Sequence, residues 1–507
     1  MESADGPGRS SSDGSALAGS KASMSLKKQV ASGVMWTGTS TGVTTGLQFL
    51  QLAVLAHLLN PGDFGLMAMI MVVVGFAQAF TDMGLSSAIV HRQDMSRQQL
   101  SSLYWVNIVG GLLVFGLVMA CTPAIVIFYR EPRLIGLMPW VALIFLVSPL
   151  GQQFQMLLQK ELQFYELTKV DMISTVIGTV IAIASAMNGS GVFSLVWGQL
   201  AESSVRAVLL ARLGWRNWRP RIHFSWNDLK GCTAFGVFQM AERTLNYFSA
   251  NVDYLVIGRF LGPHALGIYM LAYQLVTRPL AKINPILTRV AFPVFAKRQT
   301  DNSALCRGYL EMIKLLAFLV LPLLFGLAAT APVVVPVFFG PEWHAAVSLI
   351  QILALLGVFK ALVNPLGSIL LAKGRADIGF KCNALTAILN ASVFWFVVLH
   401  GVYAVAWSYV GLSFAYFIMW WKILHRIINL HHRDHAAVLI PSLVMSILMG
   451  ATVYVGYMVL SPLVGNNLIL LICLVTFGIS VYSLGSVLWS DYFRELWVLV
   501  KMQRGMA

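Results

Sequence analysis

Long apolar segments alternate with short polar interruptions along most of the chain, and this pattern decides the fold class. Fourteen segments have the roughly 20 residues that a helix needs to cross a bilayer. They lie near 31–58, 64–90, 102–128, 134–158, 168–188, 191–212, 233–261, 265–290, 309–339, 345–372, 378–400, 402–427, 437–460 and 467–489. The sequence therefore predicts an all-α polytopic membrane protein with about 14 transmembrane helices.

The charge pattern predicts how the chain is oriented. Hydrophobic residues make up 58% of the 507 positions and charged residues 11%, yet the formal charge is +14. In a soluble protein that excess would indicate nucleic acid. Here Lys and Arg gather in alternate loops, and the remaining loops hold only Arg130, Arg133 and Arg259. The positive-inside rule then places both termini in the cytoplasm, and we expect no nucleic-acid partner.

The interruptions between spans predict the domain organisation. Residues 1–25 are rich in Ser, Gly and Ala without a continuous apolar run, which predicts a disordered cytoplasmic tail rather than a cleaved signal peptide. The longest polar interruption, 212–230, leaves six predicted spans before it and eight after it. We predict an N-lobe at 26–213, a cytoplasmic linker at 214–230, a C-lobe at 231–428, and two further spans with a cytoplasmic tail at 429–507.

Two short motifs of the first half recur in the second half. Residues 59–66 and 261–268 share the frame L-x-P-x-x-(F/L)-G-(L/I), each at the turn between the first two spans of its half. Residues 149–151 and 365–367 both read Pro-Leu-Gly, each in the fourth span of its half. Parallel repeats about an axis along the membrane normal are typical of transporters whose substrate path lies between the halves.

One predicted span, the seventh, carries a polar stripe across the membrane. Gln239, Arg243, Asn246, Ala250 and Asp253 fall on one helical face. An Arg at membrane depth costs at least about 2.5–3.5 kcal/mol unless it faces a bundle interior or a wet cavity. This face is therefore expected to line a hydrophilic space inside the membrane.

Further cations lie within the predicted spans and predict the chemistry of that space. They are Arg206, Arg278, Lys282 and Lys360, and all lie from about the midplane toward the predicted cytoplasmic side. Such a cavity favours an anionic group arriving from the cytoplasm, and Arg suits a bidentate grip on phosphate. The alternative is that these cations only pair with acidic residues between helices.

The acidic residues within the spans leave two interpretations open. Asp82, Glu202 and Asp253 are candidates for coupling transport to a proton or a sodium ion, and they are equally candidates for plain counter-ions of the arginines. The sequence does not choose between them.

Other motifs give little support for catalysis or metal binding. The five cysteines are scattered and form no CxxC pair, and residues 431–435 (HHRDH) are a weak compositional signal in a predicted cytoplasmic loop. The sequence contains no P-loop, no Rossmann glycine fingerprint and no HExxH motif. We expect no catalytic residues, no metal and no cofactor.

Several motifs resemble one family of membrane transporters. These are L-x-P-x-D-F-G-L at 59–66, T-D-M-G-L-S-S-A at 81–88, and the block from Asn246 to Tyr269 that is followed by Arg289-Val290-Ala291-Phe292-Pro293. They resemble the polysaccharide transporter branch of the multidrug/oligosaccharidyl-lipid/polysaccharide (MOP) flippase superfamily, with closest similarity to Wzx-type exporters. The resemblance implies fourteen helices, two six-helix lobes in a V, alternating access, and a place in the bacterial inner membrane.

The resemblance also implies a substrate and its site. Wzx-type members flip polyprenyl-pyrophosphate-linked oligosaccharide repeat units, and their cationic cavity residues carry over to Arg206, Arg243, Arg278 and Lys282. A polysaccharide polymerase and other export machinery are then expected partners, together with membrane lipids. Two other functions stay open on the sequence: a membrane-embedded polymerase or glycosyltransferase, and a drug or small-molecule exporter of the same superfamily. Polymerases and glycosyltransferases of this kind usually have a large outer loop, which the predicted spans do not leave room for. An exporter of cationic drugs would need an acidic cavity, whereas the predicted cavity is rich in Arg and Lys.

Overall fold

The computed structural model describes residues 41–81, 95–226, 233–297 and 301–488, and within these ranges the regular elements are helices, with no strand. Residues 41–58 are helical. The α-helices that follow are α2 (Pro61–Thr81), α4 (Arg97–Tyr129), α5 (Leu134–Ala142), α6 (Ile144–Lys160), α7 (Phe164–Met187), α8 (Phe193–Gly214), α9 (Thr233–Lys297), α10 (Asn302–Phe338), α11 (Ala346–Val363), α12 (Leu366–Ala372), α13 (Ala376–Val397), α14 (Val402–Ile428), α15 (His432–Leu460) and α16 (Asn467–Leu488). Two short 3-10 helices, η2 (Pro341–Trp343) and η3 (Val398–His400), lie between them.

The predicted fold class, an all-α polytopic membrane protein, is confirmed. Among the described residues, eleven helical stretches are long and apolar enough to cross a membrane. One of them, Arg243–Asn284, contains most of the seventh and most of the eighth predicted span, because α9 continues through the turn between them. The count of fourteen spans stays a prediction, and so do the lobe boundaries; the predicted tails, 1–25 and the end of the chain, lie outside the described residues.

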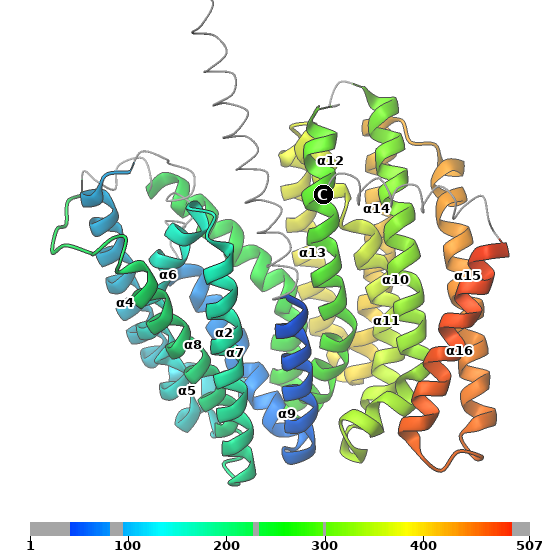
Figure 1. Cartoon of the computed structure of the whole chain (residues 1–507), viewed down its shortest axis with the longest axis horizontal. Helices are drawn as coiled ribbons and strands as arrows, with labels where there is room; N and C mark the ends of the chain where they lie inside the picture. The colour runs from blue at the N-terminus through cyan, green and yellow to red at the C-terminus, as the bar shows by residue number, and fades with distance from the viewer. Residues whose placement is uncertain (1–40, 82–94, 227–232, 298–300, 489–507) are drawn as a thin grey trace, which may run out of the picture.

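The helices form two groups with α9 between them (Figure 1). In the first group α6 packs against α4 and α8, and α7 packs against α8. Helix α2 contacts α4, α5 and α6 of this group. In the second group α10 packs against α11, α15 and α16, and α14 packs against α11 and α13. Helix α9 contacts α2 on one side and both α11 and α13 on the other, so it connects the two groups.

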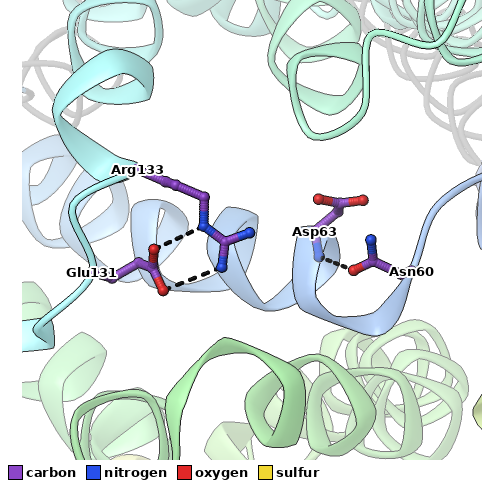
Figure 2. Close-up of polar contacts among 4 residues, drawn as sticks. All are labelled: Asn60, Asp63, Glu131 and Arg133. Atoms are coloured by element: carbon purple, nitrogen blue, oxygen red, sulfur yellow. Dashed lines mark hydrogen bonds and ion pairs between the residues drawn. The ribbon is translucent and has the colours of Figure 1, made fainter.

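Local sequence explains how α2 and α9 begin and turn at the repeated motif. Asn60 accepts a hydrogen bond from the Asp63 backbone N–H at 3.1 Å, Pro61 occupies the first helical position, and Asp63 is an acidic residue in the first turn (Figure 2). These are the residue types that favour a helix start. In the second copy Gly262 has a φ of 82°, so α9 bends there and continues from Pro263.

The repeated motif also forms a reciprocal contact between its two copies. A Cβ placed on Gly65 would lie 1.7 Å from the carbonyl oxygen of Pro263, and one on Gly267 would lie 1.8 Å from the carbonyl oxygen of Pro61. Each glycine therefore lets the backbone of the other copy approach more closely than any side chain would allow. The glycines at the seventh position of the two motifs are the contact points between α2 and the second part of α9.

Aromatic residues close the same end of the molecule around this contact. The Trp343 indole N–H donates to the Ala56 carbonyl oxygen at 3.0 Å, and the Trp343 ring packs edge-on against Phe64 with centroids 5.1 Å apart. Trp343 is fully buried. Because Trp343 follows α10 in the second group and Ala56 precedes α2, this indole joins segments 287 residues apart in sequence. The predicted outer ends of the two groups are thus in tight contact.

An ion pair lies beside the motif at the start of α5. The Arg133 Nε and Nη2 atoms donate to the two carboxylate oxygens of Glu131 at 2.8 and 3.2 Å (Figure 2). These hydrogen bonds lower the pKa of Glu131 below its ordinary value and raise that of Arg133. Figure 2 shows the Arg133 guanidinium group extending toward Asp63, so this predicted outward arginine lies beside the first copy of the repeat.

Candidate functional site

Four of the five predicted cations, together with Asn246, line two separate cavities, which we call the first and the second cavity. The first cavity, of about 570 Å³, lies between α2, α6, α8 and α9 and contains Arg206 and Arg243. The second cavity, of about 560 Å³, lies between α9, α11, α13 and α14 and contains Asn246, Arg278 and Lys360. The structure therefore divides four of the five predicted cations between two cavities, two in each.

The first cavity is lined by amides as well as cations. Gln78, Gln152, Gln155 and Gln199 contribute to its wall. Arg206 is not available as an isolated charge, because its Nη2 lies 3.0 Å from Asp171 Oδ1 on α7. Asp171 was not among the acidic residues that we expected to matter. The ion pair agrees with the alternative interpretation, in which cations within spans hold helices together, for this one arginine.

Among the described residues, the second cavity is lined by cations but by no acidic residue. Its polar wall consists of amides, hydroxyls and the two cations Arg278 and Lys360. The amides and hydroxyls belong to Asn246, Ser249, Thr277, Asn284, Asn364, Asn383, Thr386, Asn390, Ser413, Tyr273, Tyr409 and Tyr416. A positive charge inside a membrane protein needs a partner, an anion or water, to offset its desolvation. The second cavity is therefore suited to hold an anion.

Two tyrosines hold Lys360 in place. Its ammonium nitrogen donates to the Tyr273 hydroxyl at 2.6 Å and lies 4.9 and 4.6 Å from the ring centroids of Tyr273 and Tyr409. Cation–π contacts of this kind are worth about 2 kcal/mol when desolvated. The same rings are stacked on each other, with centroids 6.4 Å apart. Lys360 thus has a fixed position at the cavity wall, on α11.

Asp253 lies behind these tyrosines and is almost fully buried, with 1% exposure. Its Oδ2 accepts a hydrogen bond from the Tyr269 hydroxyl at 2.9 Å, and its Oδ1 has no hydrogen-bond partner among the described residues. Tyr269 in turn stacks on Tyr273. A buried carboxylate with one unpaired oxygen is an unusual group in a folded protein, and it keeps Asp253 among the candidates for ion coupling.

The other predicted residues have varied positions. Glu202 on α8 accepts a hydrogen bond from Thr175 at 3.0 Å. Lys282 is exposed and lines neither cavity. Asp82 lies outside the described residues, and Gln239 lies on α9 but its side chain is outside what the structure describes.

Sequence reasoning missed most of the amides of the second cavity. Asn383, Thr386 and Asn390 are spaced i, i+3 and i+7 on α13, which is a helical stripe visible in the sequence. Tyr409, Ser413 and Tyr416 form a second such stripe on α14, spaced i, i+4 and i+7. No stripe could identify Asn364, because it follows the last residue of α11. Its place in the site depends on how distant helices pack.

Comparison with known proteins agrees with this architecture. The family model described as "Polysaccharide biosynthesis protein" matches residues 54–348. The teichuronic acid biosynthesis protein TuaB of Bacillus subtilis (strain 168) is 38% identical over 80% of this chain and 84% of its own. The lipopolysaccharide biosynthesis protein WzxC of Escherichia coli (strain K12) is 33% identical over 72% of this chain and 74% of its own.

The fold is also found among solved structures. A structure of the lipid II flippase MurJ in an inward closed conformation superposes with a TM-score of 0.70 at 14% identity, over 92% of this chain and 99% of that one. At that identity the match concerns the fold alone. The resemblance to the polysaccharide transporter branch of the MOP superfamily, inferred from the sequence motifs, is confirmed. The chain belongs to the polysaccharide biosynthesis protein family.

Proposed function

We propose that this protein is a flippase that moves a polyprenyl-pyrophosphate-linked oligosaccharide repeat unit across the bacterial inner membrane for surface polysaccharide synthesis. Membership of the polysaccharide biosynthesis family supports a role in that pathway. TuaB and WzxC are named for teichuronic acid and lipopolysaccharide biosynthesis, and the MurJ structure is of a lipid II flippase. A membrane-embedded transporter without catalytic residues fits these relatives.

The second cavity carries the proposal. Among the residues that the structure describes, no carboxylate lines the space that Arg278 and Lys360 face, so a pyrophosphate there would bring negative charge to both cations. The asparagines of α9 and α13, with Asn364 after the end of α11, offer donors and acceptors for sugar hydroxyls, and Trp420 and the tyrosines offer rings against which sugars pack. Arg243, Asn246, Gln239, Arg206 and Lys282 remain proposed contacts along the path.

Transport is proposed to occur by alternating access between two lobes, 26–213 and 231–428, with both termini in the cytoplasm. The contact between the repeat motifs and the burial of Trp343 support a state closed at the outer end. Asp82, Glu202 and Asp253 are the proposed ion-coupling residues. A polysaccharide polymerase is a proposed partner, since the flipped repeat unit must be joined to others after it crosses.

The test is transport of a fluorescent lipid-linked oligosaccharide by the full chain in proteoliposomes. Arg278→Gln and Lys360→Met remove one charge each at nearly constant size, and the double variant removes both. We expect each single variant to lose about tenfold in transport and the double variant more, because one charge-assisted hydrogen bond is worth about 1.5–3 kcal/mol.

Arg375→Gln is the matched control. Arg375 is exposed, lies 3.1 Å from Asp377 and lines neither cavity. Transport at the wild-type rate by the double variant would reject the second cavity as the anion site. Extension of the glycan chain by purified protein, or specific binding of organic cations, would instead favour the polymerase or the drug exporter.

A further inference from the structure

An apolar groove of about 910 Å³, which we call the lateral groove, lies between α9, α12 and α13. Most of its lining is aliphatic or aromatic, as with Leu245, Phe248, Leu370, Phe380 and Ile388. Several of these side chains lie at an open rim, since Ile388 is 65% exposed and Phe380 58%. In a chain that spans a membrane, such a rim faces lipid.

The lateral groove is continuous with the second cavity. Asn246, Asn364, Asn383 and Trp420 line both spaces. The cavity that holds Arg278 and Lys360 therefore opens sideways, past three asparagines, into an apolar channel. These amides lie at the junction between the cationic second cavity and the apolar lateral groove. The two spaces together are therefore suited to bind a molecule with an anionic head group and an apolar chain.

Another apolar groove, of about 490 Å³ between α2, α4 and α9, does not have this connection. It shares only Tyr247 with the first cavity. The Tyr247 hydroxyl donates to the Met71 carbonyl oxygen at 2.9 Å, and its ring packs directly against Gly75. This side chain forms a wall between groove and cavity, so the lateral groove is the better candidate for an amphiphile.

We propose that the lateral groove holds the isoprenoid chain of the transported lipid while its phosphates lie on Arg278 and Lys360. This inference rests on the proposed function. Helix α12 ends and α13 begins at the predicted cytoplasmic side, so the groove starts in the half of the membrane where the cargo starts and extends past the middle of α13. The isoprenoid chain then stays among apolar side chains and lipid. Only the charged head group passes Asn246 and enters the second cavity.

The position of Gly367 allows the groove to be filled without disturbing the fold. Gly367 lines the groove on α12, has an ordinary helical conformation, and a Cβ added to it would meet no atom within 4 Å. Gly367→Phe therefore places a ring in open space, and Phe is a better helix former than Gly. Gly116→Phe is the matched control, because Gly116 is exposed on α4, has equal space around it and lines no part of this groove.

The experiment uses the full chain in nanodiscs with a diazirine-bearing polyprenyl phosphate as the probe. We expect crosslinks on α12 and α13 that unlabelled polyprenyl phosphate removes and phosphatidylglycerol does not. Gly367→Phe should reduce them, and transport, about tenfold or more, as expected when several methylene groups lose their contacts. Gly116→Phe should change neither, and the thermal midpoints of both variants should match the wild type. Ile388→Trp fills the rim from α13 and serves as the second variant.

Two results would overturn the inference. Crosslinks that phospholipid removes equally well, or that spread over the lipid-facing sides of α15 and α16, would show that the groove binds ordinary bilayer lipid. Normal transport by a folded Gly367→Phe variant would reject the groove and leave the proposed function intact. Absence of both transport and competed crosslinks in the wild-type protein would instead reject the proposed function itself.

Discussion

Replacing Gly65 or Gly267 by alanine is expected to hold apart the two helices that meet at the repeated motif. A Cβ on Gly65 would lie 1.7 Å from the Pro263 carbonyl oxygen, half the 3.4 Å at which ordinary contacts begin. The neighbour is a backbone atom, which cannot rotate away as the end of a side chain can. Helix α2 and the second part of α9 must therefore separate by about 1.7 Å at this point, or the helices must bend.

The energetic cost follows from the same geometry. Inserting a methyl group into a filled contact typically costs about 1–3 kcal/mol. Since about 1.4 kcal/mol changes an equilibrium tenfold, each variant should lower the population of the closed outer end by roughly five- to hundredfold. Gly65 and Gly267 lie in one interface, so their effects should not add; once the helices are apart, the second methyl group costs little.

The measurement is the distance between spin labels on the two groups of helices, in the full chain with its native cysteines replaced. Labels at Ile135 and Leu399 suit this purpose, because both side chains are more than half exposed, and one lies just after and the other just before a predicted outer turn. We expect one short distance in the unsubstituted protein and a longer population in Gly65→Ala and Gly267→Ala. Gly136→Ala is the control at the same end, since a Cβ there meets no atom within 4 Å.

One result would refute this reasoning. If both alanine variants keep the short distance and the same thermal midpoint, the glycine contact is not what sets the approach of the two groups. A lower midpoint with an unchanged distance would mean that the outer end stays closed and the strain is absorbed inside the fold.

Two further predictions concern the same end of the molecule. Glu131→Gln should lower the free energy of unfolding by about 1 kcal/mol or less at pH 7, because the pair is partly exposed. Since the hydrogen bonds from Arg133 lower the pKa of Glu131 from its ordinary 4.5, that contribution is present above this value and disappears as pH falls through the folded-state pKa. The thermal midpoints of variant and wild type should therefore converge as pH falls below that range. Trp343→Phe removes the hydrogen bond to Ala56 but keeps an aromatic ring, and should cost about 1–3 kcal/mol of stability in detergent-unfolding measurements, whereas Trp343→Ala should cost more.

The fold could be predicted because its signals are local and repeated. An apolar run of spanning length needs no partner to be recognised, so the helices of the described chain fall where the sequence places spans. The repeated L-x-P-x-x-(F/L)-G frame was also visible, and the structure explains its glycine, which permits backbone contact between the copies. The sequence did not indicate that the two copies touch each other.

The site was harder to predict because its chemistry depends on packing between distant segments. Lys360 lies near the end of an apolar helix and was the least informative cation in the sequence. Its position depends on Tyr273 and Tyr409, which lie on α9 and α14 and come together only in the fold. Likewise Arg206 and Arg278 lie on similar polar stripes in the sequence. Arg206 pairs with Asp171 on the neighbouring helix α7, whereas Arg278 has no ion pair with the acidic residues that the structure describes.

The polar stripe of α9 shows most clearly what the periodicity of a sequence cannot predict. The stripe is real, but its two edges face different cavities. Arg243 and Tyr247, four residues apart, line the first cavity, whereas Asn246 and Ala250, also four apart, line the second. Residues 243 and 246 differ by only about 60° around a helix, less than a single polar face usually covers. The first part of α9 thus separates the two cavities and contributes side chains to both. Substitutions at Arg243 and at Asn246 should therefore affect transport independently, even though only about one helical turn separates the two residues.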